Sequence, residues 1–161
     1  MHSATDSDQG PLIDLLNEQR LGVVATDSGA GPYLSLVAFA VTPDLNRLIF
    51  LTRRTTRKFC NIESRPQVAM LIDNRTNQPG DLAQGMAVTA LGKATELRQG
   101  ARRERAELFL AKHPDLRSFA DETETAVIEI VVSRYIVVSQ FEKVQVLERE
   151  QDPKPPLQGP A

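Results

Sequence analysis

Residues 31–58 read GPYLSLVAFAVTPDLNRLIFLTRRTTRK, and this stretch decides the fold. From Tyr33 to Val41 the chain is apolar apart from Ser35, which is typical of a strand that is buried on both faces. A turn over residues 42–46 (TPDLN) follows, and Arg47–Thr52 returns as a second strand. With the β-prone segment Leu21–Thr26 in front of them, these strands predict a three-stranded antiparallel meander.

The segments on either side continue this pattern. Pro11 suits the first turn of a helix, Thr55 or Thr56 can cap another, and Gly92 marks a β-bulge or a close backbone approach. A bend is expected near Ser133–Arg134 in the last strand. Because short turns link neighbouring strands, we expect a mostly β fold, an antiparallel barrel with peripheral helices, rather than a doubly wound sheet. The predicted helices are Pro11–Gln19, Thr55–Ser64 and Arg98–Lys112, and the further predicted strands are Val68–Ile72, Met86–Leu97 and Thr125–Phe141.

One domain accounts for the length of 161 residues. The N-terminal residues 1–10 are polar and are expected to be disordered, and the barrel domain is expected to span residues 11–147. The tail, residues 148–161, is rich in proline. It is predicted to be flexible, either disordered or wrapped around a partner.

The charge balance and the cysteine content exclude several classes of protein. The net charge of −2 argues against a nucleic-acid-binding domain, which needs a surplus of Lys and Arg. No apolar run approaches the roughly 18 residues of a membrane span, and the N-terminus lacks the layout of a secretory signal. The single cysteine, Cys60, cannot form an internal disulfide, so a cytoplasmic protein is expected. We interpret Cys60 itself as a small buried hydrophobe.

The segment Leu51–Lys58 carries the chemistry, because it ends a strand and opens a helix. Free N–H groups point out of a helix start, and the helix dipole favours an anion there. Thr hydroxyls and up to four cationic side chains stand beside these groups. Cations at a positive helix end are unfavourable unless an anion is bound. The segment predicts either a phosphate site or a solvated basic helix start, and the residues alone leave both open.

A wider pattern of motifs surrounds this segment. The central half of the chain resembles the pyridoxamine-phosphate-oxidase-like family of FMN-binding split barrels. The small bacterial members are more similar than the name-giving enzyme, since they share the turn Asp73-Asn74-Arg75 and an ending like residues 134–139 (RYIVVS). The motifs that carry the resemblance are residues 32–33 (PY), 43–44 (PD), 51–52 (LT), 56–58 (TRK), 61–69 (NIESRPQVA) and 87–94 (AVTALGKA).

The resemblance implies a split barrel that forms a homodimer with FMN at the subunit interface. Asn74 and Arg75 are expected to face the flavin or the partner subunit, or else only to close a loop. The resemblance places the FMN phosphate against Thr52, Thr56, Arg57 and Lys58, and the polar edge of the flavin ring against the backbone of Ser35, Leu36, Val37 and Ala38.

The chain departs from the oxidase proper at several positions. Ser35 and Ala40 stand where the ring-side strand of the oxidase begins with Arg and ends with Lys. Ala87 takes the position of the family's Gln, and Gln84 lies close but out of register. The C-terminal Trp-and-Arg arrangement is missing, because the chain has no Trp. A pyridoxal-phosphate substrate carries a dianion that needs cations, so we do not expect true pyridoxamine phosphate oxidase activity.

We therefore expect an FMN-dependent oxidoreductase that uses a small-molecule substrate or electron donor, with no identifiable catalytic acid or base. The alternatives are a flavin-binding module without turnover, such as an electron relay, a relative that binds haem or a deazaflavin, and a barrel with an empty cleft. His2 and His113 lack partners at metal-ligand spacing, so no metal site is predicted. Axial ligation of haem by His113 remains an alternative.

Overall fold

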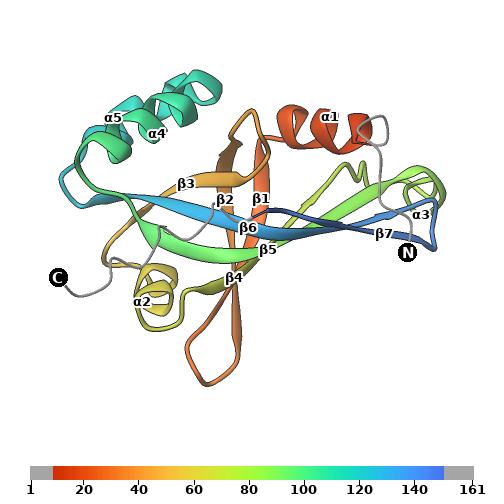
Figure 1. Ribbon diagram of the computed structural model, residues 1–161, viewed down its shortest axis with the longest axis horizontal. Coiled ribbons are helices and arrows are strands. Elements are labelled where there is room, and N and C mark those ends of the chain that lie inside the picture. Colours follow the sequence, from red (N-terminus) through yellow and green to blue (C-terminus); the bar gives the residue numbers. More distant parts are fainter. Residues whose placement is uncertain (1–8, 151–161) are drawn as a thin grey trace, which may run out of the picture.

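The computed structural model describes residues 9–150 (Figure 1). Of the predicted N-terminal segment 1–10 and tail 148–161, only residues 9–10 and 148–150 fall within this range. The first helix begins at Gly10, and the last strand ends at Glu148.

The fold is mostly β, and its centre is a barrel, as predicted. In residues 9–150, seven strands form one antiparallel sheet in the order β3-β2-β1-β4-β5-β6-β7. A further pairing between β3 and β6 closes the first six strands into a barrel, so that β7 alone lies outside the closure. The strands are β1 (Leu21–Asp27), β2 (Pro32–Val41), β3 (Arg47–Arg53), β4 (Gln67–Asp73), β5 (Met86–Glu96), β6 (Thr125–Ser139) and β7 (Lys143–Glu148).

The helices pack around this barrel. Figure 1 shows α1 and α2 on opposite sides of it, and α4 with α5 against one outer face. The side chains of Leu16 from α1 and Phe59 from α2 reach the main core. The helical segments are α1 (Gly10–Glu18), α2 (Arg57–Ser64), α3 (Asp81–Gln84), α4 (Gln99–Lys112), the 3-10 turn η2 (Pro114–Leu116) and α5 (Arg117–Asp121).

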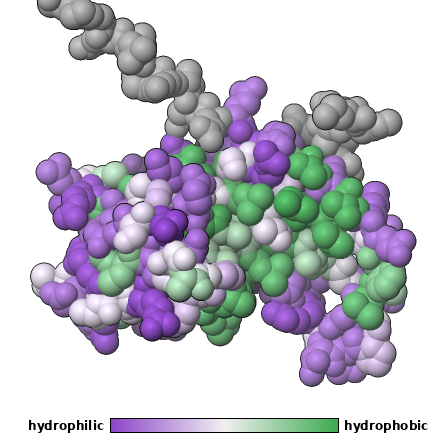
Figure 2. Space-filling model, turned by 90° about the horizontal axis from the view of Figure 1, so that it is seen from below, coloured by the Kyte–Doolittle hydropathy of each residue, from purple (hydrophilic) through white to green (hydrophobic). Residues whose placement is uncertain are grey.

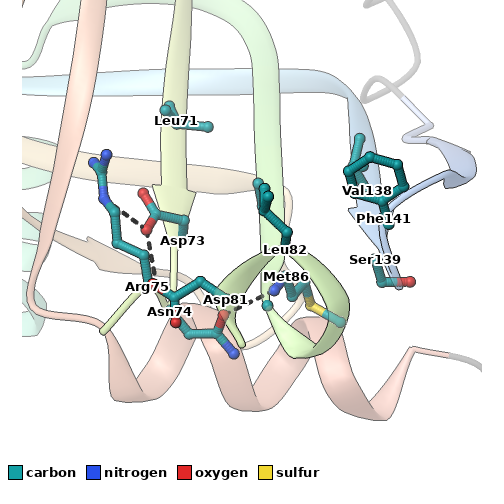
Figure 3. Close-up of a pocket in the computed structure, with 12 residues that line it drawn as sticks. Leu71, Asp73, Asn74, Arg75, Asp81, Leu82, Met86, Val138, Ser139 and Phe141 are labelled. Atoms are coloured by element: carbon teal, nitrogen blue, oxygen red, sulfur yellow. Dashed lines mark hydrogen bonds and ion pairs between the residues drawn. The ribbon is translucent and has the colours of Figure 1, made fainter. Parts of the chain in front are cut away.

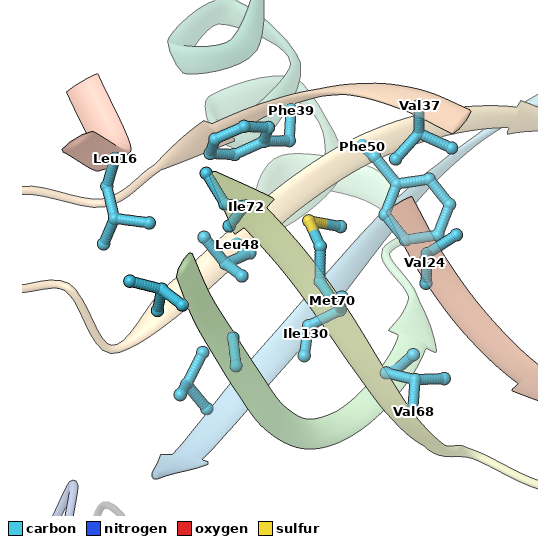
Figure 4. Close-up of a cluster of buried hydrophobic side chains, with 14 of the residues drawn as sticks. Leu16, Val24, Val37, Phe39, Leu48, Phe50, Val68, Met70, Ile72 and Ile130 are labelled. Atoms are coloured by element: carbon cyan, nitrogen blue, oxygen red, sulfur yellow. The ribbon is translucent and has the colours of Figure 1, made fainter. Parts of the chain in front are cut away.

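Two apolar clusters hold these layers together. The main cluster fills the barrel, where Val24, Phe50, Met70 and Ile130 converge from four strands (Figure 4). The second lies between the outer face of the sheet and the helices α4 and α5, and it includes Val127. Strand β6 is therefore buried on both faces over most of its length, which explains its long apolar run. Each such side chain contributes roughly 1.5–3 kcal/mol when it is fully buried.

The predicted three-stranded meander is confirmed as β1, β2 and β3. The predicted last strand is wrong at its end, because β6 stops at Ser139 and a separate strand, β7, pairs back onto it. The alternating segment Lys143–Glu148 (KVQVLE) carries the signal for β7. The short helices α3 and α5 were not predicted, because each has five residues or fewer and no clear apolar period.

The expected irregularities at Gly92 and near Ser133 prove to be one feature. The register between β5 and β6 shifts between Leu91 and Gly92, so that Ser133 has no partner across the ladder. The Ser133 hydroxyl donates to the Leu91 carbonyl at 3.0 Å, which holds the bulge. A Cβ at Gly92 would overlap the Val131 carbonyl, so the close approach requires glycine.

This close approach predicts the outcome of a matched pair of substitutions. Gly92→Ala should destabilise the fold by about 1–3 kcal/mol or more, because two backbones must move apart. Gly100→Ala adds the same carbon in the first turn of α4, where nothing lies within 4 Å, and should be neutral or stabilising by up to about 1 kcal/mol. Urea unfolding of both variants measures the difference, and equal midpoints would contradict the bulge geometry.

Candidate functional site

The barrel opens along the seam between β2 and β3. These two strands pair over only three residues, from Phe39↔Phe50 to Val41↔Leu48. Strand β3 then follows β6 as far as Arg53, whereas β2 follows β1 back to its start at Pro32. The two strands separate, and a gap forms between them.

The edge of β2 that borders this gap exposes backbone groups. The Phe39 N–H donates to the Arg20 carbonyl at 3.2 Å, which shows that Phe39 points toward β1. Backbone groups of alternate residues point to opposite edges of a strand, so the N–H and C=O of Leu36 point into the gap. In residues 9–150 no strand pairs with β2 at that position on that side.

A pocket of about 290 Å³ lies in the gap, and we call it the seam pocket. It brings together six of the ten predicted site residues: Leu36, Val37, Ala38, Thr52, Thr56 and Lys58. Its remaining wall comes from Leu51 and Arg53 of β3 and from Phe109, Leu116 and Phe119 of the α4–α5 segment. The seam pocket thus has a polar end at the start of α2 and an apolar end between β2 and the helices.

The polar end is built on the start of α2. The hydroxyls of Thr52 and Thr56 share a hydrogen bond of 2.9 Å, and the Thr56 hydroxyl donates to the Arg53 carbonyl at 2.8 Å. Thr56 is the N-cap of the helix and accepts from the Phe59 N–H. The N–H groups of Arg57 and Lys58 have no acceptor within the helix, so they remain free to bind an anion.

The four cations of the predicted basic cluster have different partners. Arg53 donates twice to the Glu122 carboxylate and lies over the Phe119 ring at 5.5 Å. Arg54 binds Glu96 and the Thr123 carbonyl, which turns it away from the pocket. Arg57 and Lys58, at the helix start, form no ion pair within residues 9–150.

Only one of these two remaining cations lines the seam pocket. Lys58 lines it, and burial lowers the pKa of its ammonium group below the ordinary value. Arg57 lies over the ring of Tyr33 at 5.3 Å, outside the lining of the seam pocket. Ser35 likewise does not line the pocket, although it is adjacent to Leu36.

The helical wall of the seam pocket was not predicted. Phe109, Leu116 and Phe119 are spaced so that they reach the pocket from α4, η2 and α5 in turn. The signal for them is weak but present, since they are apolar residues in an otherwise charged stretch. Arg53 belongs to the quoted motif, yet only the structure shows that it lines the pocket.

Asn74 and Arg75 lie in a different pocket, of about 350 Å³, beside α3 (Figure 3). The Asn74 side-chain oxygen accepts the Met86 N–H at 2.8 Å, and the Arg75 side chain forms an ion pair with Asp73 at 2.9 Å. Leu82 and Phe141 form an exposed apolar rim of this pocket. Within one chain, neither Asn74 nor Arg75 reaches the residues at the start of α2.

The His113 side chain is buried and hydrogen-bonded within the fold. It is 3 % exposed, its Nε2 lies 2.8 Å from the Phe39 carbonyl, and its Nδ1 lies 3.5 Å from the Arg20 guanidinium. This geometry argues against axial haem ligation by His113.

In residues 9–150 no three His, Cys, Asp or Glu residues gather as a metal site would need. Cys60 is exposed, so its interpretation as a buried hydrophobe is wrong. Among the described residues, no helix is both long and apolar enough to cross a membrane.

Comparison with known proteins places the fold. The family model described as pyridoxamine 5'-phosphate oxidase matches residues 12–139. No curated protein matches the chain. Solved structures share the fold at low sequence identity, and they include proteins with different names.

A haem-binding protein from Mycobacterium smegmatis has a TM-score of 0.78 and 15 % identity, over 91 % of this chain and 60 % of that one. A NimC/NimA family protein from Clostridium acetobutylicum has a TM-score of 0.67 and 17 % identity, over 89 % and 93 %. An FAD-binding protein from Mesorhizobium loti has a TM-score of 0.62 and 18 % identity, over 79 % and 89 %. The present chain thus spans about three fifths of the haem-binding protein.

The position of His113 predicts a pH dependence of stability. Burial lowers the pKa of His113 in the folded protein, so below about pH 6.5 the unfolded chain takes up a proton that the folded chain does not. Stability should therefore fall as the pH drops from 7.5 to 5.5, by up to about 1 kcal/mol from this residue. Urea unfolding at several pH values should show a smaller fall for His113→Gln, whose amide keeps a donor for the Phe39 carbonyl. Identical pH profiles would contradict the assignment.

Proposed function

The chain belongs to the pyridoxamine 5'-phosphate oxidase family, and from this premise we propose that it binds FMN in the seam pocket and acts as a flavin-dependent oxidoreductase on a small molecule. The observation that carries the proposal is the polarity of that pocket. A helix start with Thr56 and Lys58 lies at one end, and an apolar slot beside an unpaired strand edge lies at the other. FMN has the same division, with a phosphate at one end and a planar ring at the other.

The phosphate end is supported by two independent features. The dipole of α2 and the free N–H groups of Arg57 and Lys58 favour a negative charge at the helix start. Lys58 supplies a cation that no carboxylate neutralises within the described residues.

The ring end is supported by the strand edge and by the helical wall. The backbone N–H and C=O of Leu36 offer one donor and one acceptor, which suit the polar edge of a flavin ring. Phe109, Leu116 and Phe119 provide an apolar surface across the slot. In this arrangement the protein binds and orients the ring and keeps water away from one of its faces.

The titratable side chains that line the seam pocket are Arg53, which is paired with Glu122, and Lys58, which we assign to the phosphate, so we propose no side-chain acid or base for the reaction. FMN, when bound, would supply the hydride or electron chemistry. Ala40, which replaces the Lys of the oxidase proper, is buried under the helices and offers no charge to a phosphorylated substrate. The substrate we propose is therefore not pyridoxamine phosphate.

Two alternatives share part of this evidence. A deazaflavin with a similar phosphate would fit the same polar end. A flavin-binding module without turnover would bind its flavin in the same pocket. Haem is the ligand in the name of the M. smegmatis protein. Because His113 Nε2 is hydrogen-bonded to the Phe39 carbonyl, this histidine is poorly placed to ligate a haem iron, which favours a flavin over haem in this chain. The single cysteine fits our proposal of a cytoplasmic location.

We also propose that the protein works as a homodimer, with FMN at the interface. Figure 1 shows α2 and α3 on opposite sides of the barrel, and these helices carry the two pockets described above. A two-fold axis can bring Asn74 and Arg75 of one protomer to the seam pocket of the other. Hydrophobic residues gather on one face (Figure 2), as expected for an interface. Among residues 9–150, the large hydrophobic side chains that are exposed are Ile13, Leu21, Tyr33, Leu34, Leu36, Leu71, Leu82, Phe141, Val144 and Val146.

The flavin proposal predicts that the purified protein shows a flavin absorption spectrum and releases FMN on heating, at about one per chain. Lys58→Ala should weaken FMN binding by about 1.5–3 kcal/mol, the range for a charge-assisted hydrogen bond, or roughly ten- to a hundred-fold in Kd. Fluorescence quenching of FMN measures the affinity. Arg103→Ala removes an exposed positive charge from α4, away from the seam pocket, and should leave the affinity unchanged.

A colourless protein that also fails to bind added FMN would overturn the flavin proposal. Titration with a deazaflavin and with haemin then tests the two alternatives directly. Reduction of the bound flavin by NADH or NADPH separates an oxidoreductase from a module without turnover.

The dimer proposal predicts complementation between two defective chains. If Lys58 and Arg75 act on one FMN from different protomers, Lys58→Ala and Arg75→Ala each weaken binding. Coexpression of the two variants then restores roughly a quarter of the sites to wild-type affinity, because half of the dimers are mixed and each mixed dimer has one intact site. A full loss in the mixed sample, or a single-chain mass in light scattering, would contradict the proposal.

A further inference from the structure

Arg57 differs from its two arginine neighbours in how it is held. Arg53 and Arg54 are each bound to a carboxylate, Glu122 and Glu96 respectively. Arg57 has no carboxylate partner within residues 9–150. It is also the first residue of α2, where the helix dipole disfavours a positive charge.

The partner that Arg57 does have is the ring of Tyr33. The guanidinium carbon lies 5.3 Å from the ring centroid, within the range of a cation–π interaction. Tyr33 lies on β2, three residues before Leu36, so the strand that borders the seam pocket also carries this ring. Arg57 adjoins Thr56 and Lys58, which line the pocket from the helix side. The Tyr33–Arg57 pair therefore lies beside the polar end of the seam pocket, next to residues that line it from β2 and from α2.

The two kinds of partner leave an arginine in different states. A carboxylate uses the N–H donors of the guanidinium and cancels its charge. An aromatic ring attracts the face of the guanidinium and leaves the N–H donors at its edge unoccupied. An arginine on a ring is thus restrained, and it keeps both its charge and its donors for a ligand.

We propose that Tyr33 is a positioning residue, which holds Arg57 at the edge of the seam pocket so that its guanidinium binds the phosphate of the ligand. This proposal rests on the flavin proposal and adds a residue to it. It assigns Tyr33 to the phosphate-dependent part of the affinity and gives it no role toward the flavin ring.

Two substitutions at Tyr33 and two ligands test the proposal. Tyr33→Phe keeps the ring, whereas Tyr33→Leu keeps apolar bulk and removes the ring. FMN carries the phosphate, and riboflavin lacks it. We expect Tyr33→Leu to weaken FMN binding about two- to five-fold, the equivalent of an exposed cation–π pair, and to leave riboflavin binding unchanged. Tyr33→Phe should bind FMN as the wild type does. Fluorescence titration measures all four affinities.

A double-mutant cycle isolates the pair. In the Arg57→Ala background, Tyr33→Leu should have no further effect on FMN affinity, because the group it positions is gone. The proposal is overturned if Tyr33→Leu weakens FMN and riboflavin equally, if Tyr33→Phe is as weak as Tyr33→Leu, or if the two substitutions are additive.

The same titrations separate this failure from a failure of the flavin proposal. A wild-type protein that binds FMN better than riboflavin supports the phosphate site, whatever the Tyr33 variants do. A wild-type protein that binds neither ligand, or both equally, overturns the phosphate site and the role of Tyr33 together.

Discussion

The pairing of β3 with β6 is the constraint on which the site depends. It closes the barrel, and it runs along the full length of β3, from Arg47 to Arg53. Strand β2 is paired with β1 from Pro32 to Ala38. Beyond the Phe39↔Phe50 pair, β3 continues along β6 and β2 continues along β1, so the two strands diverge and their shared seam covers only three residues. The gap beyond Phe39 lies between these diverging strands.

Charge around the seam is organised so that two cations support the walls and two remain for a ligand. The Arg54–Glu96 pair ties the end of β3 to the end of β5, and Arg53 ties it to Glu122 after α5. Of the two pairs, Arg53–Glu122 connects the strand wall of the seam pocket to the segment that follows the helical wall. Arg57 and Lys58 come next in the chain, where the start of α2 would repel them. A bound anion would offset the cost of placing them there, which is the reason we propose a binding site at the polar end.

Much of the fold was predictable from the sequence, because its strands are apolar and its turns carry Gly, Pro, Asp or Asn. The grouping of Thr56, Arg57 and Lys58 was predictable for a local reason: they are adjacent in the chain, so helix geometry alone brings them together, and their role toward a phosphate stays a prediction. The partners of Arg53 and Arg54 were not predictable, because Glu122 and Glu96 lie about 40 to 70 residues away and meet them only after barrel closure. Strand β7 was missed for a different reason: half of its residues are polar, and its alternation was outweighed by the proline-rich sequence that follows.

The part of the site that was hardest to predict is its helical wall. In the proposed complex the strand edge would bind through backbone groups, which any sequence can supply, and the helix start would recognise any phosphate ester. Neither can select a substrate. The wall formed by Phe109, Leu116 and Phe119 is made of side chains, lies across the slot from β2 and comes from a charged segment with little apolar periodicity. Because it lacks an acid or a base, this wall can select by shape and apolar contact, which favours a flat and largely uncharged reacting group. Selectivity is therefore expected to depend on the α4–α5 segment, while the barrel supplies the common binding frame.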